Sequence, residues 1–103
     1  MRYDVVLSHS AENQLTEYVL YIASNSGEPN TEIDFLNDVR DAANKLDEFP
    51  DRGIVPRDPI IRRRGYRCLF IGNYAAFYKV IKDRNLVVIE AFCSLKKDYK
   101  NLL

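Results

Sequence analysis

Residues 65–93 have the sequence GYRCLFIGNYAAFYKVIKDRNLVVIEAFC, and this stretch decides the fold. It contains three runs of apolar and aromatic residues, which two short polar segments separate. Runs of this composition are typical of β-strands, and connections this short join antiparallel neighbours. The sequence therefore predicts strands at residues 66–71, 74–81 and 86–93.

The first half of the chain has a helical period instead. Apolar residues recur at intervals of three and four positions in two segments, which a glycine and a proline separate. This pattern predicts helices over residues 10–25 and 31–48. The expected core combines the inward stripes of both helices with the strands: Leu15, Val19, Leu36, Val39, Leu46, Leu69, Phe77, Val88 and Ile89.

Two remaining segments complete the predicted fold. Residues 2–8 are rich in valine and predict an opening strand, whereas residues 51–64 have a glycine, two prolines and no period, which predicts a loop. The order β-α-α-β-β-β predicts one α+β domain over residues 1–103, a small antiparallel sheet with a two-helix hairpin on one face. The hairpin covers only that face, so the tail, a second copy or a binding partner is expected on the other.

The formal net charge is zero, but the charges are segregated along the chain. Residues 1–51 carry 3 basic and 11 acidic side chains, a net −8, and residues 52–103 carry 12 basic and 4 acidic ones, a net +8. Such asymmetry is typical of a protein with a polyanionic partner. It is equally expected if acidic helices attract a basic sheet within the molecule, and both explanations stay open.

Composition also bounds the compartment and the cofactors. No apolar run approaches the roughly 20 residues that span a bilayer, and the N-terminus lacks a signal-peptide pattern, so we expect a cytoplasmic protein. Cys68 and Cys93 lie in apolar runs and are expected to be buried, without a disulfide in a reducing compartment. A zinc site would need more ligands, because His9 is the only histidine, and no metal is expected. No other cofactor is expected either.

Four segments in succession resemble the RelE/ParE family of type II toxin–antitoxin toxins. Residues 10–15, SAENQL, resemble the start of the family's first helix, and residues 45–50, KLDEFP, resemble the end of its second helix. Residues 65–80, GYRCLFIGNYAAFYKV, are similar to its central strand pair, and residues 93–103, CSLKKDYKNLL, to its C-terminal motif. The resemblance extends over nearly the whole chain.

The resemblance implies a toxin that a cognate antitoxin holds inactive by wrapping its tail over it. Two branches of the family differ in target. RelE-like members cut messenger RNA on the ribosome without a metal, whereas ParE-like members inhibit DNA gyrase and have no established catalytic residues. The implied partners are therefore the antitoxin and either gyrase or the ribosome with its messenger RNA. A homodimer and a toxin–antitoxin hetero-oligomer both stay open.

Metal-free RNA cleavage needs a group that takes the proton of the 2′-hydroxyl and cations that hold the charged phosphorane. If the chain is a ribonuclease, it offers four candidate catalytic residues: Arg67, Lys96, Lys97 and Tyr99. RelE-like enzymes carry an arginine directly after the tyrosine that begins the third strand, but here Ala75 follows Tyr74. This departure favours a ParE-like gyrase inhibitor. A RelE-like endonuclease and a degenerate, non-toxic antitoxin-binding module are the alternatives.

Four arginines are the candidate binding residues: Arg62, Arg63, Arg64 and Arg67. Guanidinium groups pair well with phosphate and with carboxylates, so this cluster suits a nucleic acid or an acidic antitoxin tail. The alternative is a solvated loop end for the first three residues, and for Arg67 a charged strand start that pairs with a helix carboxylate.

Overall fold

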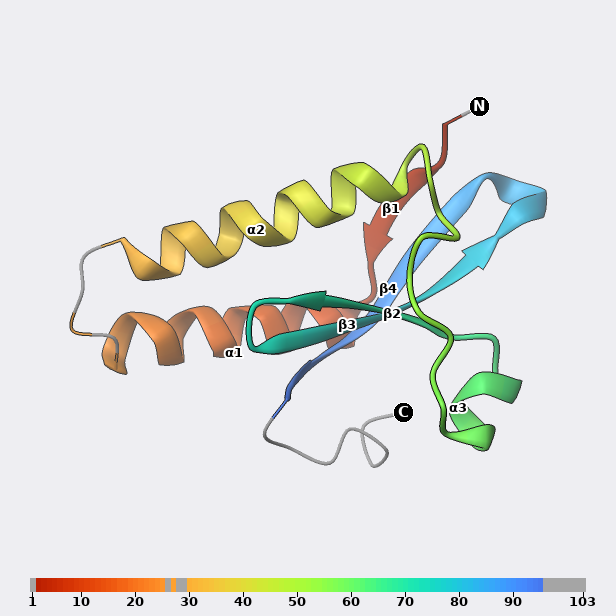
Figure 1. The fold of residues 1–103 in the computed structure, drawn as a ribbon. Coiled ribbons are helices and arrows are strands. Elements are labelled where there is room, and N and C mark those ends of the chain that lie inside the picture. Colours follow the sequence, from red (N-terminus) through yellow and green to blue (C-terminus); the bar gives the residue numbers. More distant parts are fainter. Residues whose placement is uncertain (1, 26, 28–29, 96–103) are drawn as a thin grey trace.

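The computed structural model describes residues 2–25, 27 and 30–95 (Figure 1). The predicted strands and long helices are all present, with boundaries within two residues of the expected ones. The elements are β1 (Asp4–Leu7), α1 (His9–Asn25), α2 (Thr31–Leu46), α3 (Pro59–Arg63), β2 (Arg67–Ile71), β3 (Tyr74–Ile81), a 3₁₀ turn (Lys82–Arg84) and β4 (Leu86–Ser94). The α+β class is therefore confirmed.

The strands form one sheet in the order β1-β4-β3-β2. β2, β3 and β4 are antiparallel neighbours, as predicted. β1, however, pairs with β4 in parallel, with Asp4 opposite Leu86 and Leu7 opposite Ile89, so the sheet is mixed rather than wholly antiparallel. A parallel pair needs a long connection, and here the helical hairpin, the loop and two strands all lie between β1 and β4 in the sequence.

The helices α1 and α2 lie side by side across one face of the sheet (Figure 1). Burial of their apolar stripes forms the main core and is the dominant favourable term in folding. The helices contribute Ala11, Phe35, Val39 and Leu46, and the sheet contributes Ile71, Ala76, Tyr78, Val87, Ile89 and Phe92.

Most predicted core residues are buried or partly buried, but Leu36 is an exception at 37% exposure. The buried stripe of α2 passes through Phe35, Val39 and Leu46, at intervals of four and seven residues. These intervals match the helical repeat and keep the three side chains on one side of the helix. Leu36 follows Phe35 directly, so its side chain is rotated toward the solvent. The sequence pattern therefore identified the helix and its buried residues Val39 and Leu46 correctly, but it assigned Leu36 to the core where the structure buries Phe35.

The segment predicted as a loop contains the short helix α3. Asp58 begins it, because its carboxylate accepts hydrogen bonds from the backbone N–H groups of Ile60 at 3.0 Å and Ile61 at 3.1 Å. Pro59 occupies the first helical position, where its missing N–H costs nothing. Ile61 is buried against Tyr66 and the sheet, so α3 packs on the face that α1 and α2 leave uncovered.

Side chains of α1 form hydrogen bonds with the backbone at the end of β4. Because β1 ends opposite Ile89, the later residues of β4 have no strand on that side. Gln14 accepts a hydrogen bond from the Phe92 N–H at 2.7 Å, and the hydroxyl of Tyr18 accepts one from the Ser94 N–H at 3.2 Å. These bonds satisfy polar backbone groups that would otherwise be unpaired near the core.

Candidate functional site

The open face of the sheet, by which we mean the face turned away from α1 and α2, is largely apolar. Its buried residues are Ile61, Tyr66, Cys68, Ala75, Phe77, Ala91 and Cys93. Both cysteines are buried, as predicted. Burial raises the pKa of the Cys68 thiol to about 11, so this residue is a neutral thiol and not a nucleophile near pH 7.

Ala75, the second residue of β3, lies on this face and is 2% exposed. Phe70 on β2 and Cys93 on β4 are its direct neighbours across the sheet. The resemblance to RelE-like enzymes implies an arginine at this position, and here a methyl group lies among apolar side chains.

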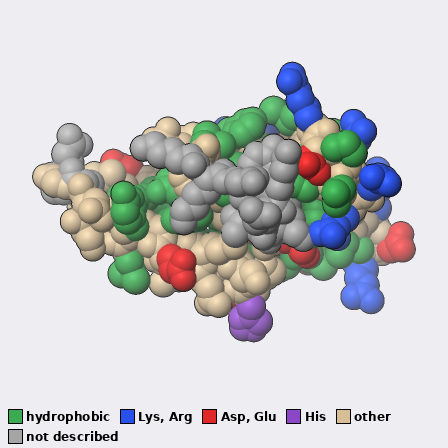
Figure 2. Space-filling view, turned by 90° about the horizontal axis from the view of Figure 1, so that it is seen from below, with side chains coloured by type: hydrophobic (Ala, Val, Ile, Leu, Met, Phe, Trp, Pro, Cys, Tyr) green, Lys and Arg blue, Asp and Glu red, His purple; other side chains and the backbone are tan. Residues whose placement is uncertain are grey.

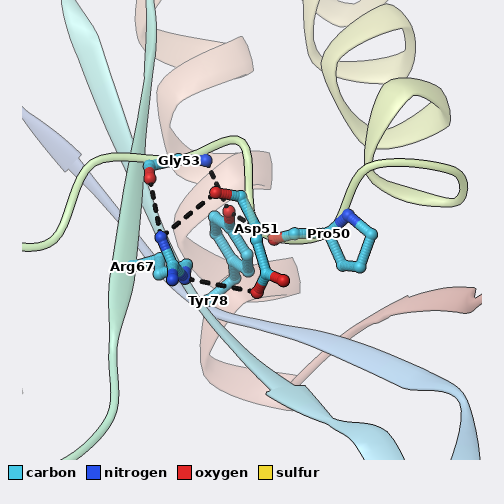
Figure 3. A network of polar contacts seen from close by, with 5 residues as sticks. All are labelled: Pro50, Asp51, Gly53, Arg67 and Tyr78. Atoms are coloured by element: carbon cyan, nitrogen blue, oxygen red, sulfur yellow. Dashed lines mark hydrogen bonds and ion pairs between the residues drawn. The ribbon is translucent and has the colours of Figure 1, made fainter.

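Arg67 begins β2, and its guanidinium group fixes the loop that follows α2 (Figure 3). Its Nη1 donates hydrogen bonds to the backbone oxygens of Asp51 and Gly53, each at 3.1 Å. Its Nε lies 3.6 Å from a carboxylate oxygen of Asp51, and the side chain is 31% exposed. The expected pairing with a carboxylate is therefore present, but the partner belongs to the loop and not to a helix.

Tyr78 also binds the backbone of this loop through its hydroxyl (Figure 3). Its fully buried hydroxyl donates to the backbone oxygen of Pro50 at 2.8 Å and accepts from the Gly53 N–H at 2.9 Å. Burial raises the pKa of Tyr78, so its hydroxyl keeps the proton that it donates. A Cβ on Gly53 would lie 2.5 Å from that hydroxyl and 2.9 Å from the Cys68 oxygen, which explains the glycine.

The other three candidate binding residues lie apart from this loop network. Arg62 and Arg63 belong to α3, Arg64 follows it, and all three side chains are exposed. Figure 2 shows Lys and Arg side chains gathered among hydrophobic ones at the end of the molecule that holds α3. We call residues 62–64 and their surroundings the basic end. Its side chains are exposed, although the Nε of Arg63 donates to the Pro59 oxygen of the same helix at 3.3 Å, whereas the guanidinium of Arg67 is bonded to the loop.

A polar trio on the open face was not predicted from the sequence. The Tyr66 hydroxyl donates to a Glu90 carboxylate oxygen at 3.2 Å, and the Lys79 ammonium lies 4.5 Å from the centre of the Tyr66 ring. Burial, together with the charge of Glu90, raises the pKa of Tyr66. A register shift between Phe77 and Tyr78 leaves Glu90 without a residue opposite it on β3, and no sequence period signals such a bulge.

Three of the candidate catalytic residues lie outside the described residues: Lys96, Lys97 and Tyr99.

Within residues 2–25, 27 and 30–95, no three His, Cys, Asp or Glu side chains are placed to hold a metal ion. No helix in that same part of the chain is long and apolar enough to cross a membrane.

Solved structures with this fold come from toxin–antitoxin systems. The chromosomal ParDE toxin–antitoxin system of P. aeruginosa superposes with a TM-score of 0.72 at 14% identity, covering 90% of this chain and 96% of that one. The RelBE2 toxin–antitoxin complex of Mycobacterium tuberculosis gives 0.64 at 20% identity, over 91% and 92%. A mutant of the E. coli toxin RelE in the free state gives 0.59 at 12% identity, over the full length of both chains. The fold is thus that of the RelE/ParE toxins.

The sequence places the chain within this class. Residues 5–99 match the family model described as the ParE toxin of the type II toxin–antitoxin system parDE. The chain therefore belongs to the ParE toxin family. No curated protein matches the sequence.

Proposed function

We propose that this toxin acts by binding, as an inhibitor of a nucleic-acid machine such as DNA gyrase, and that a cognate antitoxin neutralises it in the cytoplasm. The observation that carries the proposal is the apolar surrounding of Ala75 on the open face. A binding toxin needs no charged constellation there, whereas a ribonuclease does.

The chemistry of RNA cleavage explains why the apolar surroundings of Ala75 argue against a ribonuclease. A phosphorane requires cations fixed in advance, and loss of one such contact typically costs about 100- to 1000-fold in rate. On the described open face, Lys79 is engaged over the Tyr66 ring. Arg67, one of the candidate catalytic residues, is bonded to the loop after α2.

The basic end supports a role in binding an acidic partner. Arg62 and Arg63 are exposed on α3 together with the apolar side chain of Ile60, a combination that suits an acidic segment with apolar residues. The solved structures of the ParDE system and the RelBE2 complex support an antitoxin as one such partner.

The experiment compares two activities of the purified chain. We expect inhibition of gyrase supercoiling at stoichiometric concentrations and no cleavage of ribosome-bound messenger RNA. Cleaved messenger with unaffected gyrase would contradict the proposal. Ala75→Arg is a poor test, because it would force a charge into a buried apolar site.

The alternative function is a ribosome-dependent endonuclease, and the Tyr66–Glu90–Lys79 trio is the observation that favours it. A carboxylate, a phenol and an ammonium on one sheet face are groups that move protons and hold phosphate. If the wild type cuts messenger, Glu90→Gln and Lys79→Met should abolish cutting, and Asp83→Asn serves as the matched control. Inactivity in both assays would favour a non-toxic antitoxin-binding module.

A further inference from the structure

A groove lies between the helical hairpin and the β2–β3 turn, far from the basic end. Its volume is about 740 Å³, and α1, α2 and the turn at Gly72–Asn73 line it. A second hollow of about 330 Å³ shares Asp38, Ile71 and Gly72 with it and continues along α2. Together they form one depression, the α2–β2 groove.

The floor of the larger part is aromatic. The rings of Tyr18 and Tyr74 lie 4.7 Å apart, and those of Phe35 and Tyr74 lie 4.8 Å apart. Tyr21 lines the side of the groove and is 63% exposed. Burial raises the pKa of Tyr18 and of Tyr74, so both phenols are neutral and the floor suits an apolar anchor.

The rim of the larger part is acidic. Glu17 on α1 and Asp34 and Asp38 on α2 line it, and among the described residues that do so there is no lysine or arginine. Lys45 and Arg52 line only the smaller hollow. The groove therefore has the opposite charge to the α3 end of the molecule.

The edge of β2 beside the smaller hollow has backbone groups available for pairing. Cys68 exchanges two hydrogen bonds of 2.8 Å with Ile54, which shows that its N–H and C=O point away from β3. Phe70, two residues further, has the same orientation and lines the hollow. An extended chain can thus add its backbone to this edge, a common mode of peptide recognition.

We propose that the α2–β2 groove docks an extended, cationic segment of a partner protein. Its Lys or Arg side chains pair with Glu17, Asp34 and Asp38, an apolar or aromatic residue rests on the ring floor, and its backbone meets β2 at Phe70. The proposal follows from the groove alone and does not depend on the target of the toxin. The groove requires a cationic ligand, whereas Arg62 and Arg63 suit an acidic one.

A display library of random 12-residue peptides, selected on the full-length chain, tests the proposal. Enriched peptides should be net cationic and should contain an aromatic residue or leucine. Fluorescence polarisation with the enriched peptides should show about tenfold weaker binding to the triple variant Glu17→Gln, Asp34→Asn, Asp38→Asn than to the wild type. The difference between the two proteins should shrink at high salt, because salt screens the charges. Tyr21→Ala should also weaken binding, because it removes an exposed groove wall.

A matched control carries three neutralised acids outside the groove: Asp4→Asn, Glu12→Gln and Asp83→Asn. It should bind the peptides within about twofold of the wild type, since screening weakens distant charges. Acidic enriched peptides, or equal losses in the groove variant and the control, would overturn the proposal.

Two further measurements exclude other occupants of the groove. Self-association of the wild type that the groove variant abolishes would make a second copy the occupant and overturn the proposal. A tenfold gain in peptide affinity on deletion of residues 96–103 would make the chain's own C-terminus the occupant, with the same consequence.

Discussion

Tyr78→Phe is the most informative single change, because it removes one oxygen atom and leaves the ring in place. That oxygen accepts a hydrogen bond from the Gly53 N–H and donates one to the Pro50 carbonyl (Figure 3). Both partners are backbone groups beside a fully buried ring. The variant leaves them without a partner, and each buried orphan group costs about 1–3 kcal/mol.

We therefore expect Tyr78→Phe to lower the free energy of unfolding by about 2–4 kcal/mol. Urea denaturation followed by circular dichroism measures it. With an m-value of about 1–2 kcal/mol/M for a chain of this size, the midpoint should fall by about 1 M or more. The matched control is Tyr21→Phe, whose ring is 63% exposed and which should change stability by less than about 0.5 kcal/mol.

A double-mutant cycle with Arg67→Gln shows whether the loop contacts act together. Arg67 bonds to the Asp51 and Gly53 oxygens of the same loop. Loosening the loop by one change should reduce the cost of the other, with a coupling energy above about 0.5 kcal/mol. Strict additivity, or a Tyr78→Phe midpoint equal to that of the wild type, would refute the assignment of this network as the anchor of the loop.

Three further predictions follow from packing, titration and charge. Phe35→Ala should destabilise the fold by about 3–5 kcal/mol and Leu36→Ala by less than about 1.5, measured by urea denaturation, because only the former is buried. Burial raises the pKa of Cys68 from 9.0 to about 11. The neutral thiol therefore contributes about 2–3 kcal/mol to the free energy of unfolding below pH 9, and this contribution is lost as the pH rises from 9 through 11. Cys68→Ala should flatten the dependence of the free energy of unfolding on pH in that range. Replacing Arg62 and Arg63 with alanine should slow antitoxin association in stopped-flow measurements and reduce its dependence on salt.

The period of the sequence was sufficient to predict the strands and the long helices. The inner face of α2 was harder, since Phe35 and Leu36 are adjacent and both apolar, and only packing against the sheet selects one of them. The helix α3 had a local signal, Asp58 followed by Pro59, but a helix of five residues is too short to show a period.

The candidate site was less predictable because its contacts join distant parts of the chain. Residues 67 and 78 are neighbours across β2 and β3, but their contacts with residues 50–53 depend on the path of a loop that has no period. The parallel pairing of β1 with β4 is likewise a long-range choice that no local pattern encodes. Arg67 was predicted to bind a partner or, in a ribonuclease, to take part in catalysis; the structure shows its guanidinium bonding to the loop, and the predicted role stays a prediction.

The segregation of charge along the sequence has two explanations, and the structure weighs them. If attraction between acidic helices and a basic sheet were the main reason, ion pairs should join the two halves of the chain. Among the ion pairs of the described residues, Arg67–Asp51 does so, whereas Arg2 pairs with Asp47 and Glu48 inside the acidic half. Four acidic side chains instead line the α2–β2 groove, and three exposed arginines lie on and directly after α3: Glu17, Asp34, Asp38 and Asp41, and Arg62, Arg63 and Arg64. Because surface charges contribute little to folding but strongly steer association, this arrangement supports two binding surfaces of opposite sign on a molecule with no net charge.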